Sequence, residues 1–369
     1  MRDVTIVGAG KIGGIVAMLL ADTQDYRVTV VDRSTDALAT LKPPIRRLCL
    51  DIDSAEALKT AFTGQFAVLS AAPYHLTLKV AEAAVAAGAH YLDLTEDVAS
   101  TRGVKLLAAG AETALIPQCG LAPGFISIVA ADIAKSFDTL HDVRLRVGAL
   151  PRYPSNALNY NLTWSTDGVI NEYCEPCEAI VDGELRQTRA LEECETFALD
   201  GVGYEAFNTS GGLGTLAETL AGKVRTLNYR TIRYPGHAAI MKALLNDLRL
   251  RDRRELLKDI LENAVPATLQ DVVIVFVTVS GEKGGHLVQE TYANRIYARE
   301  VDGRTLSAIQ VTTASSLCAV LDLLAQGKIA DKGFVRQEEI ALDLFLRNRF
   351  GRVYALSDTS AAPQMESAA

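Results

Sequence analysis

The sequence lacks the features that mark nucleic-acid-binding, membrane-spanning and disulfide-stabilised proteins. Its 37 lysines and arginines are outnumbered by 45 aspartates and glutamates, so no basic excess is present to neutralise nucleic-acid phosphates or anionic membrane surfaces. No run of roughly 18 uninterrupted apolar residues predicts a transmembrane helix. Six cysteines among 369 residues are too few for a disulfide scaffold. We therefore expect a large protein that binds neither nucleic acids nor membranes.

A secretory signal is not expected either, although Arg2 precedes an apolar run that ends near Leu20. A signal peptide forms a continuous helix, and glycines interrupt this run at Gly8, Gly10, Gly13 and Gly14. Because the sparse cysteines also fit a reducing compartment, we predict a cytoplasmic protein.

The first third of the chain alternates short β-branched runs with apolar helical patterns, as βαβ units do. Strands are predicted at 4–7, 27–31, 47–50, 66–71, 90–94 and 114–118, and helices at 11–21, 54–62, 76–87 and 98–111. Six strands in this order fit one doubly wound parallel sheet, so the predicted class is α/β with an N-terminal Rossmann domain.

Beyond Gly124 the strands alternate apolar and polar residues, which predicts a second, α+β domain with an antiparallel or mixed sheet. At 143–147 the valines and leucine point one way and the two arginines point to a solvated face. Hairpins are predicted around Asp182-Gly183 and between 272–280 and 287–297. Helices are predicted at 215–221, 237–248, 253–262, 312–325 and 337–347.

These patterns divide the chain into four parts. Residues 1–124 are predicted to bind a nucleotide, and residues 125–311 to bind substrate and support oligomerisation. Residues 312–357 are predicted to form helices that return to the first domain, and residues 358–369 a frayed tail. An exposed sheet face in the second domain would suit a homodimer or homotetramer.

A glycine fingerprint, G-x-G-x-x-G, directly follows the first predicted strand and opens a helix. Gly8 would make the tight turn, Gly10 would let a pyrophosphate approach the backbone, and Gly13 would allow close packing of helix and strand. The free N–H groups at the helix N-terminus favour phosphate, so Lys11 and Ile12 are also assigned to the cofactor site.

Asp32 at the end of the second strand is the expected partner of the adenosine ribose hydroxyls. Its charge would repel a 2′-phosphate, although Arg33 could soften that repulsion, so the predicted cofactor is NAD. Asp51, after the third strand, could flank the adenine or be an ordinary strand-end residue. Loops after the later strands should converge on the same edge of the sheet and add Ala71, Ala72, Pro73, Cys119 and Gly120 to the cofactor site.

Several runs resemble the saccharopine dehydrogenase-like family, and more narrowly its bacterial lysine 6-dehydrogenase branch. They are Val7-Gly-Ala-Gly-Lys-Ile-Gly13, Ala72-Pro-Tyr74, Tyr91-Leu-Asp-Leu-Thr95, Gly120-Leu-Ala-Pro-Gly124, Thr163-Trp-Ser165 and Thr231-Ile-Arg-Tyr-Pro-Gly-His237. The loop from Gly120 to Ser127 lacks the acids typical of the NADP-dependent saccharopine reductases. This departure and Asp32 favour the NAD-dependent deaminating branch.

The resemblance implies oxidative deamination of the ε-amine of L-lysine, with NAD as hydride acceptor and a product that cyclises to a piperideine carboxylate. The ε-ammonium group, with a pKa of about 10.4, must lose a proton first, so a base is required. Candidates are Glu96, Asp97, His75 and His237. Helix capping is the alternative for Glu96, Asp97 and His75, an exposed position is another for His75, and a helix start is the alternative for His237.

The substrate α-carboxylate needs an anion site, for which Arg233 on a predicted strand is the candidate, with Tyr234 beside it. Trp164, the single tryptophan, with Ser165 could wall the aliphatic stem of lysine or pack in the core, and Tyr74 follows the fourth strand. Cys174-Glu-Pro-Cys177 lacks a second ligand pair, so no metal site is predicted. The open alternatives are a saccharopine-forming or saccharopine-cleaving enzyme and a catalytically silent nucleotide-binding protein.

Overall fold

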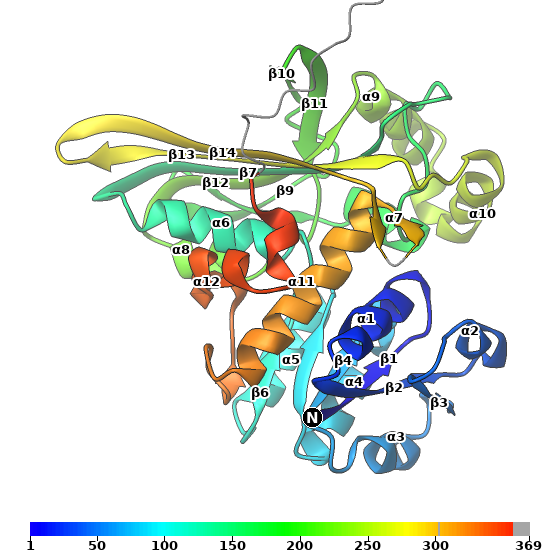
Figure 1. Ribbon diagram of the computed structural model, residues 1–369. Coiled ribbons are helices and arrows are strands. Elements are labelled where there is room, and N and C mark those ends of the chain that lie inside the picture. Colours follow the sequence, from blue (N-terminus) through cyan, green and yellow to red (C-terminus); the bar gives the residue numbers. More distant parts are fainter. Residues whose placement is uncertain (302, 357–369) are drawn as a thin grey trace, which may run out of the picture.

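The structure is a computed structural model that describes residues 1–301 and 303–356. Two sheets, one above the other in Figure 1, organise the chain, and the long helix α11 (Ala308–Ala325) runs from one to the other. The N-terminal third builds the lower sheet with its helices, and the middle of the chain builds the upper one.

The lower sheet is parallel, and its strand order β17-β6-β5-β4-β1-β2-β3 is that of a doubly wound fold. All six predicted strands are present, and a seventh, β17, which was not predicted, pairs in parallel with β6. The strands are β1 (Arg2–Val7), β2 (Tyr26–Asp32), β3 (Arg46–Cys49), β4 (Ala67–Ser70), β5 (His90–Asp93), β6 (Ala114–Ile116) and β17 (Gly333–Phe334).

Helices cover both faces of this sheet because its strands carry apolar side chains on both sides. Ile6 of β1 packs in the core cluster that contains α1 and α11, whereas the neighbouring Val7 packs in the cluster of α3, α4 and α5. The four predicted helices are confirmed, and a short α2 was missed. The helices are α1 (Lys11–Asp22), α2 (Thr35–Ala39), α3 (Ala55–Phe62), α4 (Thr77–Ala86) and α5 (Val98–Ala108).

The upper sheet is mixed: β7 runs parallel to β12 and antiparallel to β13. Both predicted hairpins are present, with β8 pairing β9 and β13 pairing β14. The strands are β7 (Thr139–Pro151), β8 (Cys177–Val181), β9 (Glu184–Thr188), β10 (Glu195–Leu199), β11 (Val202–Asn208), β12 (Val224–Arg233), β13 (Asp271–Lys283) and β14 (His286–Tyr297), and β15 (Arg299–Val301) pairs with β16 (Arg304–Leu306) outside this sheet.

The prediction of a solvated arginine face on β7 was wrong for Arg146. This side chain is buried, forms an ion pair with Glu195 at 2.5 Å and lies over the ring of Phe276. Glu195 comes from β10, three strands away in the sheet, and Phe276 from the adjacent β13, so no local pattern in β7 reveals these partners.

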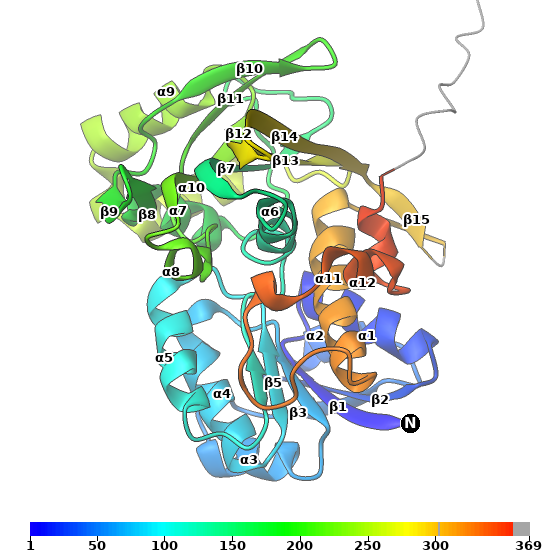
Figure 2. The same ribbon diagram turned by 90° about the vertical axis from the view of Figure 1, so that its left-hand side faces the viewer.

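The helices of the upper half flank the second sheet and extend beyond its edge (Figure 2). Helices α6 (Phe125–Ala134) and α7 (Thr166–Cys174) were not predicted, whereas α8 (Leu216–Leu220), α9 (His237–Lys242) and α10 (Arg254–Ala264) lie within or close to predicted ranges. The helix predicted over 237–248 changes to π-helical geometry after Lys242.

The helix predicted over 337–347 is broken. A 3₁₀ turn at Gln337–Glu339 is separated from α12 (Leu342–Arg347) by Ile340 and Ala341, which are extended. The break lets Ile340 enter the core while the Gln337 side-chain amide donates to the carbonyl oxygen of Pro117 at 2.8 Å. The predicted frayed tail lies outside the described residues.

Helix α11 packs against α1 and so ties the end of the chain to the first domain. It is long and apolar enough to cross a membrane by length and composition, but 83% of it is buried inside the protein. Its apolar character therefore reflects a core position.

Candidate active site

The glycine fingerprint forms a turn that has no room for a side-chain atom at two of its three glycines. Gly8 has a φ of +105°, and a Cβ on it would lie 2.9 Å from the carbonyl oxygen of Ala71. A Cβ on Gly13 would lie 1.9 Å from the carbonyl oxygen of Gly8, whereas a Cβ on Gly10 would meet nothing within 4 Å. Gly8 and Gly13 let the turn pack closely on the sheet, whereas Gly10 faces open space.

Helix α1 begins at this turn, and no side chain caps its N-terminus at Gly10. Unpaired N–H groups and the positive end of the helix dipole are what a phosphate group requires. The exposed Gly10 and Lys11 border this terminus. The residues present therefore fit the pyrophosphate of a dinucleotide.

Asp32 ends β2 beside this turn and is half-buried. Its carboxylate accepts hydrogen bonds from the backbone N–H of Ala9 at 2.7 Å and of Ser34 at 2.8 Å. Asp32 thus shapes the phosphate turn in addition to any contact with the ribose. Arg33 and Asp51 are exposed near the same edge, and the Asp51 carboxylate accepts from the N–H of Asp53.

The loops after β4 and β6 differ in what they can offer to a cofactor. Ala71 and Ala72 are half-buried beside Gly8, with Pro73 exposed. Cys119 and Gly120 are buried: the Cys119 thiol donates to the carbonyl oxygen of Ile116 at 3.0 Å, and the Gly120 carbonyl accepts from Ser316 at 2.9 Å. In this structure these two residues pack the base of the loop.

Asp93 lies at the carboxyl end of β5, and the sequence prediction did not single it out. Its carboxylate accepts from the N–H of Thr95 at 3.0 Å and of Gln118 at 2.9 Å, so it joins the ends of β5 and β6. Burial raises its pKa to about 6.

The predicted catalytic candidates Glu96, Asp97 and His75 lie in very different surroundings. Asp97 is the N-cap of α5, its carboxylate accepting from the N–H of Ser100 at 2.7 Å. His75 is exposed on the 3₁₀ turn at Tyr74–Leu76. The capping alternative for Asp97 is what the structure shows, which leaves Glu96 as the acid of this loop.

Glu96 lies close enough to Glu172 of α7, a residue that the sequence prediction missed, for its charge to act on that carboxyl group. The backbone segment Ser210-Gly211 contacts both: the Ser210 N–H donates to the Glu172 carbonyl oxygen at 3.0 Å, and a Cβ on Gly211 would lie 3.3 Å from that of Glu96. Burial raises the pKa of Glu96 to about 7. Burial and the neighbouring Glu96 charge raise the pKa of Glu172 to about 8. Two acids, one from each domain, thus have pKa values near neutral pH.

Arg233, the last residue of β12, is buried and lies close enough to Glu172 for the two charges to interact. Its Nε donates to the Tyr173 hydroxyl at 3.0 Å and its Nη1 to the Ile232 carbonyl at 2.9 Å. Its guanidinium carbon lies 5.0 Å from the centre of the Tyr160 ring. The positive charge of Arg233 lowers the pKa of Glu172, which opposes the effect of burial.

His237 completes a hydrogen-bonded chain behind Arg233. His237 Nδ1 lies 2.9 Å from the carbonyl oxygen of Leu158, which can only accept, so Nδ1 carries the proton. Nε2 then accepts from the Tyr173 hydroxyl at 3.1 Å, and that oxygen accepts from Arg233. Burial and the Arg233 charge lower the pKa of His237 to about 3. His237 is a neutral positioning residue here, which corrects its prediction as a proton acceptor.

The remaining predicted substrate residues are distributed differently. Tyr234 lies in the core cluster on the outer side of the sheet, where its hydroxyl donates to the Pro151 carbonyl at 3.0 Å, so it is turned away from Arg233. Ser165 is the N-cap of α7, and Trp164 packs so closely on Gly168 that a Cβ there would lie 2.3 Å from its ring. Tyr74 is half-buried near His75.

We name Glu96, Glu172, Tyr173, Arg233 and His237 the acid–arginine cluster. Glu172 and Tyr173 escaped prediction because α7 was not recognised as a helix. The available signal was their position just after the family-like run Thr163-Trp-Ser165.

The predicted absence of a metal site concerns Cys174 and Cys177. Both are free thiols, and burial raises the pKa of Cys177 to about 12, which disfavours the thiolate that metals bind. Within residues 1–301 and 303–356, no three His, Cys, Asp or Glu side chains are grouped to hold a metal ion.

Comparisons with known proteins place this arrangement in a family. Residues 4–115 match the family model of the saccharopine dehydrogenase NADP binding domain, and residues 120–348 match that of the saccharopine dehydrogenase C-terminal domain. The mitochondrial alpha-aminoadipic semialdehyde synthase of Mus musculus is 24% identical over 193 residues, which cover 50% of this chain and 21% of that protein.

A solved structure, the saccharopine dehydrogenase (L-Glu forming) of Saccharomyces cerevisiae, shares the fold. The two chains are 17% identical with a TM-score of 0.78, over 94% of this chain and 96% of that one. The two family models together span the glycine turn, the acid–arginine cluster and α11. The chain belongs to the saccharopine dehydrogenase family, with an NAD(P)-binding first domain.

Proposed function

We propose that the protein is an NAD-dependent dehydrogenase that oxidatively deaminates the ε-amine of L-lysine. The observation that carries this proposal is the acid–arginine cluster, in which the half-buried Glu96 and the buried Glu172 and Arg233 lie where the two domains meet. An amino acid with a second amine offers the complementary charges: a carboxylate for Arg233 and an ammonium group for the acids.

The raised pKa values of the acids suit proton removal from an amine. With pKa values of about 7 and 8, Glu96 and Glu172 are partly protonated at neutral pH in the free protein. A cationic substrate would stabilise their ionised forms, and a base with a pKa near the working pH is the most effective proton acceptor. We assign proton removal from the ε-ammonium group to this pair.

The tyrosine–histidine chain has a different task in the proposal. Tyr173 and His237 hold Arg233 through its Nε, which fixes the plane of the guanidinium. A fixed guanidinium can present its remaining N–H groups to a carboxylate in one orientation. His237 therefore serves substrate orientation, not proton transfer.

The bound dinucleotide would supply the oxidising power for the reaction. The substrate gives up a hydride from its ε-carbon and a proton from its ε-nitrogen, and water then replaces nitrogen at that carbon. Lysine, NAD⁺ and water thus yield the semialdehyde, NADH, an ammonium ion and a proton. The position of Asp32 at the end of β2 supports NAD over NADP, because an acidic side chain there would repel a 2′-phosphate.

A second candidate is reduction or cleavage of saccharopine, which the family membership favours. Incubation of the purified protein with NAD⁺ and lysine, ornithine, diaminopimelate or saccharopine separates the two. We expect NADH and ammonia with lysine. Glutamate released from saccharopine would favour the second candidate, and tight NAD⁺ binding without turnover of any amine would rule out both.

A further inference from the structure

A cavity of about 510 Å³ lies at the edge of the lower sheet where β1 and β2 begin. The glycine turn follows the other end of β1, and a strand of six residues spans about 20 Å, so the cavity is separate from the cofactor site. Its walls come from the first residues of β1 and β2, the end of α11, and α12 with the segment after it. Its volume lies in the range typical of small-molecule sites.

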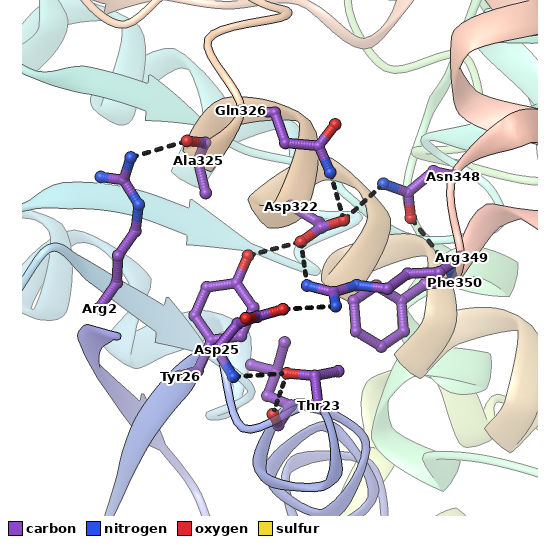
Figure 3. Close-up of polar contacts among 11 residues, drawn as sticks. Arg2, Thr23, Asp25, Tyr26, Asp322, Ala325, Gln326, Asn348, Arg349 and Phe350 are labelled. Carbon is purple, nitrogen blue, oxygen red and sulfur yellow. Dashed lines mark hydrogen bonds and ion pairs between the residues drawn. The ribbon is translucent and has the colours of Figure 1, made fainter.

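A polar network centred on the buried Asp322 lines the cavity (Figure 3). The Asp322 carboxylate, which is 2% exposed, accepts from Tyr26 at 2.7 Å, Asn348 at 2.8 Å, Gln326 at 2.8 Å and Arg349 at 2.6 Å. Four donors saturate this carboxylate, so it offers nothing further to a cationic ligand.

The second acid of the cavity, Asp25, is also occupied, because it forms an ion pair with Arg349 at 2.6 Å. Arg349 thus forms ion pairs with both acids of the cavity wall. The single positive charge of Arg349 offsets one of these two negative charges. The balance of charge in the cavity is therefore set by its other charged side chains.

Those other side chains are all cationic. Lys328 is exposed and has no ion pair within the described part of the chain. Arg347 reaches Asp343 only at 3.6 Å, and its side chain is 79% exposed. Arg2 uses one guanidinium nitrogen on the Ala325 carbonyl at 2.7 Å, and in Figure 3 it lies apart from the Asp322 network.

The end of α11 would normally repel an anion, but its last carbonyls are paired here. Those of Asp322, Leu323 and Leu324 accept from the backbone N–H groups of the following turn, and that of Ala325 accepts from Arg2. In a chain with a formal net charge of −8, this cavity therefore presents an excess of positive charge, because four cationic side chains line it against two acidic ones.

We propose that this cavity binds a small multivalent anion, with Lys328, Arg347 and Arg2 as its cationic contacts. The shared chemistry is two or more negatively charged oxygen groups on one small molecule, as in polycarboxylates and in phosphates. Because the walls join β1 and β2 to the returning C-terminal segment, a bound anion would stabilise that junction.

Isothermal titration of the full chain with citrate, and separately with pyrophosphate, at constant ionic strength tests the proposal. We expect saturable binding of one anion per chain, weakened at least about tenfold in the double variant Lys328→Gln/Arg347→Gln. Tighter citrate binding would assign the carboxylate class, and tighter pyrophosphate binding the phosphate class. The matched control Lys332→Gln removes an exposed cation paired with Glu112, outside the cavity, and should bind like the unaltered protein.

Two results would overturn the proposal. One is the absence of saturable binding of either anion at low millimolar concentration. The other is binding that the double variant leaves unchanged, which would place the anion elsewhere, for example at the N-terminus of α1. Neither result depends on the reaction that the protein catalyses.

Discussion

Glu172 is the side chain on which the proposed chemistry depends most. Replacing it with Gln keeps the shape of the side chain but removes its ability to take a proton. We expect kcat/KM for lysine to fall about 100-fold or more, as for loss of a general base, while NAD⁺ affinity is kept. The control Glu184→Gln changes a glutamate whose side chain is 72% exposed. Activity within a few-fold of the unaltered protein would show that Glu172 is not the base.

The same residue should make stability depend on pH. Its pKa is about 8 in the folded chain against an ordinary value of 4.5, so the folded state holds the proton more tightly. This contribution to stability is complete below pH 4.5 and is lost as the pH rises to about 8. Urea unfolding at pH 5 and pH 9 should show Glu172→Gln gaining about 2 to 4 kcal/mol relative to the unaltered protein over this interval. A difference that does not change with pH would contradict the raised pKa.

Asp32 combines a structural contact with a proposed selective one. It accepts the N–H of Ala9 in the phosphate turn and should also accept the ribose hydroxyls of NAD. Asp32→Ser should weaken NAD⁺ binding about tenfold or more and NADP⁺ binding much less, measured by fluorescence titration. Asp36→Ser, at an exposed position in α2, is the control. Equal losses for both cofactors would mean that Asp32 only shapes the turn.

At the scale of elements, two glycines in the turn between β1 and α1 are expected to have different tasks: Gly13 is needed for folding and Gly10 for cofactor binding. A methyl group on Gly13 would clash with the Gly8 carbonyl, so Gly13→Ala should destabilise the protein by about 2 to 4 kcal/mol. A methyl group on Gly10 meets no protein atom, so Gly10→Ala should fold normally and lose cofactor affinity. Thermal unfolding and NAD⁺ titration measure the two effects. Equal stability of the two variants would contradict the geometry of the turn.

The elements that could be predicted from the sequence are those with a local signal. The strands and helices of the lower sheet follow apolar runs and the glycine fingerprint, and the two hairpins follow their turns. β17 could not be predicted, because two residues, Gly333 and Phe334, carry no periodicity and form a strand only by pairing with β6. The break at Ile340 likewise depends on a distant partner, the carbonyl of Pro117 that binds Gln337.

The candidate site shows the same limit. Glu96 and Arg233 could be selected from the sequence by their places at strand ends. Glu172 could not, because its raised pKa arises from burial beside Glu96, 76 positions away in the chain. The correction of His237 has the same origin, since Tyr173 and Leu158 fix its tautomer.

At the scale of the whole molecule, the two domains meet at the acid–arginine cluster. The first domain contributes Glu96, and the second contributes Glu172 and Arg233, so neither domain holds the proposed site alone. α11 ties the second half of the chain back to α1. Assembly into a homodimer or homotetramer remains a prediction, which the mass of the protein in solution would test.

The most direct test of the proposed reaction uses L-lysine that carries deuterium on the ε-carbon and nitrogen-15 in the ε-amine. After incubation with NAD⁺, the proposal predicts deuterium in the reduced nicotinamide and nitrogen-15 in the released ammonia, in equal amounts. Reduced cofactor without deuterium, or ammonia without nitrogen-15, would mean that the bond broken is not at the ε-carbon and would contradict the proposed function.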